Sequence, residues 1–156
     1  MKRLFLLMLC LCICGCGSIG SMESDDLDLS KVNEQIDAFI AEGSWQMGIL
    51  QDNVSNETLW EEYGISDAMV SEFLVRQSLV EATCDEIMIF HVRDGQMELV
   101  EEQIQLRQNR KLQSLDRLPY QKTMLAHMQI VKKGNYLIAA CGTDSTNVIQ
   151  YISSLR

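Results

Sequence analysis

The first sixteen residues constrain this 156-residue chain more than any other stretch. Lys2 and Arg3 give it a positive start, and an uncharged apolar run follows from Leu4 to Ile13. A run of this length is typical of a secretory signal peptide, and it is shorter than the ~20 residues that a membrane-spanning helix needs. The rest of the chain is therefore predicted to fold outside the cytoplasm.

The leader ends in Ile13-Cys14-Gly15-Cys16, which resembles the lipobox of bacterial lipoproteins. The small residues before Cys16 let an extended backbone enter a narrow protease site, and its thiolate is the nucleophile that takes an acyl-glycerol group. Each of the other leader cysteines follows a bulky Leu or Ile. Residues 1–15 are thus predicted to be a lipoprotein signal peptide and Cys16 the lipidated residue, with an uncleaved N-terminal anchor as the alternative.

The leader cysteines recur at every second position, but this spacing does not predict a metal site. Zinc and iron–sulfur ligands usually have two or more residues between them. Three of the four cysteines also lie in the part that is predicted to be removed. No cofactor is predicted anywhere in the chain.

The net charge of the chain without its leader limits the classes of partner that it is expected to bind. Removal of Lys2 and Arg3 with the leader takes the formal net charge from −9 to −11. Such a domain repels phosphate backbones, so nucleic acid is not an expected partner. It also repels anionic headgroups, so the diacylglycerol and palmitate on Cys16 are expected to hold it at the outer face of the bacterial cell membrane.

Residues 16–29 are predicted to be the lipidated cysteine and a flexible tether. They are rich in Gly and Ser and then acidic, and a coil of this length spans ~20 Å. The acidic cluster lacks the glycine turn and the distal glutamate of a calcium loop, so it is interpreted as solvated. Residues 30–156 are predicted to be a single globular domain with one core.

Hydrophobic spacing in that domain predicts an α+β fold. The expected elements are a helix capped by Ser30, a short helix over 57–63, strands over 72–80 and 86–92, a helix over 96–118 ended by Pro119, strands over 125–132 and 135–141, and a helix capped by Asp144 or Ser145. Two strands precede a helix twice, and we interpret this order as a pseudo-repeat of hairpin–helix units. We expect a four-stranded antiparallel sheet with an N-terminal helix and with helices mainly on one face.

Several side chains are assigned from the same pattern. Phe73, Val75 and Leu79 are expected to point inward, and the strand over 135–141 to be covered on both faces. Charged residues of the long helix, Arg107 and Lys111 among them, are assigned to a salt-bridged outer face. Asp85-Glu86 is interpreted as a solvated turn, and Trp45, Trp60 and Tyr63 as a cap on the edge of the core.

Three stretches give the chain a family resemblance: 59–65 (LWEEYGI), 82–90 (ATCDEIMIF) and 133–138 (KGNYLI). They resemble the signature blocks of an uncharacterised lipoprotein family of clostridia and their relatives, domain of unknown function 4358. The resemblance covers roughly residues 30–155 and the leader. It implies the fold, a bacterial origin and an envelope location, and it transfers no catalytic residue.

The remaining candidates are two cysteines and two histidines. Cys84 and Cys141 can form a disulfide outside the cytoplasm, or remain two buried thiols. His91 and His127 could meet across the sheet and bind a metal with Cys84 or Asp85, but packed or surface histidines are the favoured interpretation, and no metal site is assigned.

No catalytic motif occurs, so no catalytic residue and no enzymatic activity are assigned. The favoured hypothesis is a membrane-anchored, extracytoplasmic binding or protein-interaction module with a protein partner in the cell envelope. The alternatives are an envelope hydrolase and an accessory subunit of a transporter or spore-envelope complex.

Overall fold

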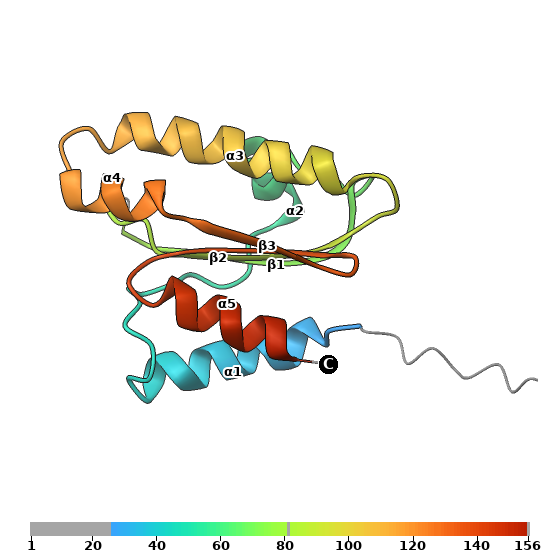
Figure 1. Cartoon of the computed structure of the whole chain (residues 1–156), viewed down its shortest axis with the longest axis horizontal. Helices are drawn as coiled ribbons and strands as arrows, with labels where there is room; N and C mark the ends of the chain where they lie inside the picture. Colours follow the sequence, from blue (N-terminus) through green and yellow to red (C-terminus); the bar gives the residue numbers. More distant parts are fainter. Residues whose placement is uncertain (1–25, 81, 156) are drawn as a thin grey trace, which may run out of the picture.

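The computed structural model describes residues 26–80 and 82–155, and Figure 1 shows their α+β fold. The predicted signal peptide, Cys16 and most of the predicted tether lie outside the described residues. A four-stranded antiparallel sheet forms the centre, as predicted. Its strands, in the spatial order β1-β2-β4-β3, are β1 (Val70–Gln77), β2 (Glu86–Val92), β3 (Gln129–Lys133) and β4 (Tyr136–Cys141).

The two inner strands carry the core. Every residue of β4 is buried, and in β2 only His91 is partly exposed. They pair in register from Glu86 opposite Cys141 to His91 opposite Tyr136. The prediction that the strand over 135–141 is covered on both faces is confirmed.

Helices cover both faces of the sheet, as Figure 1 shows. The expectation that they lie mainly on one face is wrong, because successive residues of β2 and β4 are apolar on alternate sides and both sides need cover. One face carries α1 (Leu29–Ala41) and α5 (Ser145–Ser154); the other carries α3 (Met97–Ser114), α4 (Pro119–Ala126), α2 (Asn56–Thr58) and the π-helix η1 (Leu59–Tyr63).

The two hairpin–helix units are therefore not related by a rotation. β2 and β4 are antiparallel neighbours, so a two-fold axis that exchanged them would run perpendicular to the sheet and leave both following helices on one face. Instead, α3 and α5 lie on opposite faces. The repeat is one of element order only.

The folded domain begins before the predicted boundary at residue 30. Asp28, not Ser30, caps α1, and its carboxylate accepts a hydrogen bond of 3.2 Å from a backbone N–H of the first turn. Leu27 and Leu29 are buried, and the Leu27 backbone N–H donates to the Tyr136 hydroxyl at 3.0 Å. The last residues of the predicted tether thus belong to the core.

Pro119 begins a helix that the sequence analysis missed. α4 occupies the place where a strand over 125–132 was predicted to start, and β3 begins only at Gln129. Proline fits the first turn of a helix because its missing N–H would have no partner there. It therefore separates two helices rather than a helix and a strand.

Smaller differences concern the ends of elements. β1 begins and ends earlier than predicted, so that Leu79 lies beyond it and is exposed, whereas Val75 is buried and Phe73 is half-buried. Among the helices described here, none is long and apolar enough to span a bilayer.

Candidate functional site

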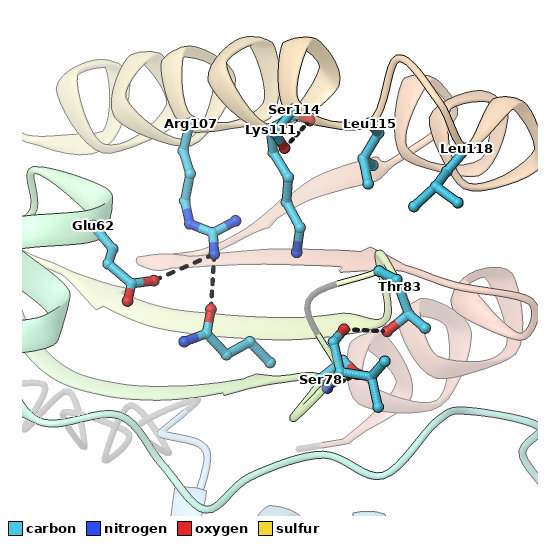
Figure 2. Close-up of a pocket in the computed structure, with 11 residues that line it drawn as sticks. Glu62, Ser78, Thr83, Arg107, Lys111, Ser114, Leu115 and Leu118 are labelled. Carbon is cyan, nitrogen blue, oxygen red and sulfur yellow. Dashed lines mark hydrogen bonds and ion pairs between the residues drawn. The ribbon is translucent and has the colours of Figure 1, made fainter.

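A groove of about 610 Å³ opens between the C-terminal half of α3 and the turn that joins β1 to β2, at the end of the sheet where β2 begins. Its floor is a network of buried charged and polar side chains, and Figure 2 shows the view into it. The described residues that line it are Glu62, Gln77, Ser78, Val80, Ala82, Thr83, Arg107, Lys111, Ser114, Leu115 and Leu118.

Glu86 lies beneath the groove and is fully buried. The Arg107 Nη1 atom donates to its Oε2 atom at 2.8 Å, and the Tyr63 hydroxyl donates to its Oε1 atom. The Lys111 Nζ atom lies 3.8 Å from Oε2. A buried carboxylate is tolerated when cations and hydrogen bonds replace its water, and here each carboxylate oxygen accepts a hydrogen bond.

Arg107 connects this carboxylate to the elements around it. Its Nη2 atom donates to Gln77 Oε1 at 2.9 Å and lies 3.8 Å from a carboxylate oxygen of Glu62. Its guanidinium carbon lies 4.0 Å from the centre of the Tyr63 ring, a cation–π distance. Burial and the negative charge of Glu86 raise the pKa of Tyr63 far above its ordinary value, so the phenol keeps its proton as a donor.

The assignment of Arg107 and Lys111 to a salt-bridged outer face is wrong. They continue the inward stripe of Val100, Ile104 and Leu115 at steps of three and four residues. The stripe positions between Ile104 and Leu115 are polar, and this interruption of the apolar spacing was the missed signal.

Asp85-Glu86 is not a solvated turn either, since both residues are buried. Asp85 lies beside the network rather than in it, and its carboxylate accepts a hydrogen bond of 3.1 Å from the Gly48 backbone N–H. A Cβ atom at Gly48 would come within 2.9 Å of this carboxylate, and one at Gly142 closer still, so a larger residue at either position would displace the carboxylate. Burial raises the pKa of Asp85.

Among the described residues, Lys111 is the cation of the network that lines the groove without a hydrogen bond to another member. Figure 2 shows it extending from α3 between Arg107 and Leu115. Its side chain is 19% exposed, and Glu86 is its only ion-pair partner among the residues that the structure describes. The hydroxyls of Ser78, Thr83 and Ser114 line the groove but form local hydrogen bonds with the backbone. The ammonium is thus the group best placed to donate to an anionic ligand.

An aliphatic rim borders the groove. It consists of Ile49, Leu79 and Val80, which are 71%, 61% and 50% exposed. The Leu79 backbone N–H donates to the Ile49 carbonyl at 3.0 Å, so the two residues are held side by side by an isolated bridge between Leu50 and Ser78. Contiguous exposed aliphatic side chains next to a polar groove are typical of an interaction surface.

Cys84 and Cys141 lie behind the groove in a small apolar cluster with Leu115 and Leu125. Both are buried and both are free thiols. Their thiols share a hydrogen bond, which together with burial raises the pKa of Cys141. The structure brings the predicted pair together as two thiols.

The histidines are not brought together. His91 stacks on Tyr136 with ring centres 4.6 Å apart, and its Nε2 atom lies 4.0 Å from a carboxylate oxygen of Asp26. His127 ends α4 on the other side of the sheet. No group of three His, Cys, Asp or Glu side chains in residues 26–80 and 82–155 is arranged to hold a metal ion.

The three aromatic residues before the sheet also separate. Trp45 packs against Phe39 and Tyr151 beside α1 and α5, and Tyr63 enters the Glu86 network on the opposite face. Trp60 is 61% exposed. The prediction that these three residues together cap the edge of the core is therefore wrong.

Two of the three signature stretches meet in the network, because Tyr63 belongs to 59–65 and Glu86 to 82–90. No curated protein and no solved structure gives a significant match to the chain. The model of one family, Domain of unknown function (DUF4358), matches residues 44–142, a span that contains the network, the aliphatic rim and the whole sheet. The chain therefore belongs to the DUF4358 family.

Proposed function

We propose that this protein is a lipid-anchored binding module at the outer face of a bacterial cell membrane, held there through Cys16. Its groove takes a segment of an envelope protein that carries a carboxylate beside aliphatic side chains. The observation that carries this proposal is the position of the Lys111 ammonium, which enters an open groove that the aliphatic rim borders.

The polarity of the fold supports the proposal. The first described residues lie where β2 ends, since Asp26 lies near His91 and Leu27 bonds to Tyr136. The groove lies at the other end, where β2 begins at Glu86. A tether that enters at residue 26 therefore leaves the groove facing away from the attachment point.

The chemistry of the groove selects the ligand. Glu86 occupies Arg107 through a short hydrogen bond, whereas its distance from Lys111 is 3.8 Å, which leaves the ammonium protons available to a nearer acceptor. A ligand carboxylate here gains a charge-assisted hydrogen bond, and aliphatic side chains beside it cover Leu79 and Ile49. An acidic protein repels most acidic partners, so specificity has to come from this local charge.

Site-specific photo-cross-linking in cells tests the proposal. A photoreactive residue replaces Ser114, which lines the groove, and in a matched strain replaces Gln150, which is exposed on α5 across the sheet. We expect one envelope protein to be cross-linked from position 114 only. Mass spectrometry of the cross-linked peptide should find Asp, Glu or a C-terminal carboxylate next to aliphatic residues.

Three substitutions accompany the cross-linking experiment. Lys111→Met keeps the apolar stem and removes the charge, and it should abolish the cross-link, whereas Lys31→Met on exposed α1 surface should not. Cys16→Ala should lose the cross-link by releasing the protein from the membrane. A cross-link that survives Lys111→Met would overturn the assignment of the groove. A partner that is an integral membrane complex would identify the protein as an accessory subunit.

A further inference from the structure

We propose a second binding site, for a neutral saccharide, around Trp60. It lies in a separate pocket of about 360 Å³ between η1 and the start of β1. This proposal does not rest on the proposed function, because the pocket shares no lining residue with the groove.

The exposure of Trp60 follows from the π-helix that carries it. Leu59 and Tyr63, at the two ends of η1, are both buried, and Gly64 at φ 69° ends the helix. These anchors fix the rotation of η1, so Trp60 cannot turn inward without expelling one of them. Single-turn π-helices are rare and are found frequently at functional sites. An indole kept 61% exposed in this way is available to a ligand.

The pocket beside the indole combines an apolar floor with a polar rim. Ile65, Val70 and Phe73 lie in the apolar cluster beneath it. Asn56, Asp67 and Arg93 supply an amide, a carboxylate and a guanidinium at its edge. The Arg93 Nε atom donates to the Asp67 backbone carbonyl at 2.7 Å, which fixes the guanidinium at the rim.

This combination selects the class of ligand. One carboxylate and one guanidinium cancel in charge, so the pocket does not favour a phosphorylated ligand. The polar rim disfavours an acyl chain, because its groups would be desolvated without partners. A sugar ring has an apolar face that stacks on an indole, and hydroxyls that both donate to a carboxylate and accept from an amide or a guanidinium. The volume is at the lower end of the range of ligand pockets, ~300–1,000 Å³, which suits a small ligand.

Tryptophan fluorescence tests the site directly, because the chain has two tryptophans and Trp45 is buried. The full-length protein carrying Trp45→Phe, purified in detergent, reports on Trp60 alone. It is titrated with maltotriose, cellotriose and chitotriose up to millimolar concentration. We expect at least one of them to shift the emission of Trp60 saturably and to protect it from iodide quenching.

Calorimetric titration of the same sugar into variants that keep Trp45 gives the second readout. Trp60→Ala should weaken binding by at least about tenfold, the effect of removing a central aromatic contact. Asn56→Ala should weaken it less, and Tyr120→Ala, which removes an equally exposed aromatic on α4, should not change it. No saturable shift with any of the three sugars, or equal affinity in Trp60→Ala, would overturn the proposal.

Discussion

Glu86 shows how a single buried charge organises its surroundings. Its carboxylate replaces water with the Tyr63 hydroxyl and the Arg107 guanidinium, and these come from η1 and α3. A buried ion pair adds little net stability compared with apolar packing, but its loss is costly because the partner then remains buried and unpaired. The network therefore fixes how η1 and α3 sit on the sheet, rather than adding stability of its own.

Removal of one member should expose this asymmetry. Glu86→Gln leaves Arg107 with only the more distant and partly exposed Glu62 carboxylate, and it is expected to cost roughly 3–5 kcal/mol of unfolding free energy. Tyr63→Phe removes only one donor and should cost about 1–3 kcal/mol. Urea unfolding followed by circular dichroism measures both, with Tyr120→Phe on the exposed surface as the control. Equal, small costs for all three would contradict the structure of the network.

Asp85 should give the protein a defined pH dependence. Burial raises its pKa above the ordinary 3.8, so the folded state holds this proton more tightly than the unfolded chain does. Its contribution to stability is therefore complete below the ordinary pKa, and it is lost as the pH rises through the folded pKa. Asp85→Asn cannot ionise and so does not lose this stability. The unfolding free energy of the variant should therefore rise relative to that of the parent from about pH 3 to about pH 7.

The same urea measurement at the two pH values tests this direction. Asp52→Asn, at an exposed carboxylate, is the matched control. A difference between Asp85→Asn and the parent that stays constant with pH would mean that Asp85 does not titrate differently on folding.

At the scale of elements, hydrophobic periodicity predicted a helix or strand correctly where apolar residues alone filled its buried face. Glu86–Val92 was predicted with its observed ends, because its residues are strand formers bounded by turn signals. The inner face of α3 was misread because Arg107 and Lys111 take positions of an apolar stripe, and only the distant Glu86 makes this possible. Such a pairing depends on tertiary contacts that spacing along one helix cannot reveal.

The candidate site was accordingly less predictable than the fold. Its anionic member was interpreted as part of a solvated turn and its cations as surface charges, so no residue of the network was assigned to a site. The aliphatic rim was missed for a related reason: Ile49 and Leu79 look like core residues until the structure places them opposite each other beside an isolated bridge at the end of the sheet.

Oxidation of the two buried cysteines should join β2 and β4 covalently. Cys84 precedes β2 and Cys141 ends β4, and their thiols already share a hydrogen bond. With glutathione disulfide as the oxidant, the two thiols should lose two protons and two electrons to form one disulfide and two glutathione molecules. A native loop of this length is expected to gain about 2–4 kcal/mol of stability.

Alkylation of the denatured protein before and after reduction, read by mass spectrometry, measures the state of the pair. We expect alkylation at residues 84 and 141 only after reduction, and urea unfolding at a higher midpoint for the oxidised form. Cys141→Ala is the control that cannot close the bridge. Alkylation of both thiols before reduction would show that the core holds them apart.

At the scale of the whole molecule, α1 completes the domain by covering the face of the sheet that α5 leaves open (Figure 1). Arg76 of β1 holds the helix to the sheet by donating to Asp37 of α1 at 2.5 Å. The same guanidinium is oriented by its hydrogen bond to the Gln51 carbonyl at 2.9 Å. Leu27, which precedes the helix, and Leu29 at its first position extend this contact. The folded domain therefore includes the chain from Leu27 onward, an earlier start than composition suggested.

This position predicts a sharp boundary for truncation. A chain that starts at residue 26 should unfold with the free energy of the full-length protein, because residues from 26 onward include the buried leucines and the Asp28 cap. A chain that starts at residue 30 should lose roughly 3–6 kcal/mol of unfolding free energy, ~1.5–3 kcal/mol for each leucine. That is a large fraction of the ~5–15 kcal/mol that stabilises a typical domain. Urea unfolding of the two chains measures the difference, with Leu27→Ala in the longer chain as the matched intermediate. Equal stability of the two chains would mean that residues 26–29 are not part of the folded domain, and it would remove the support for a groove that faces away from the proposed anchor.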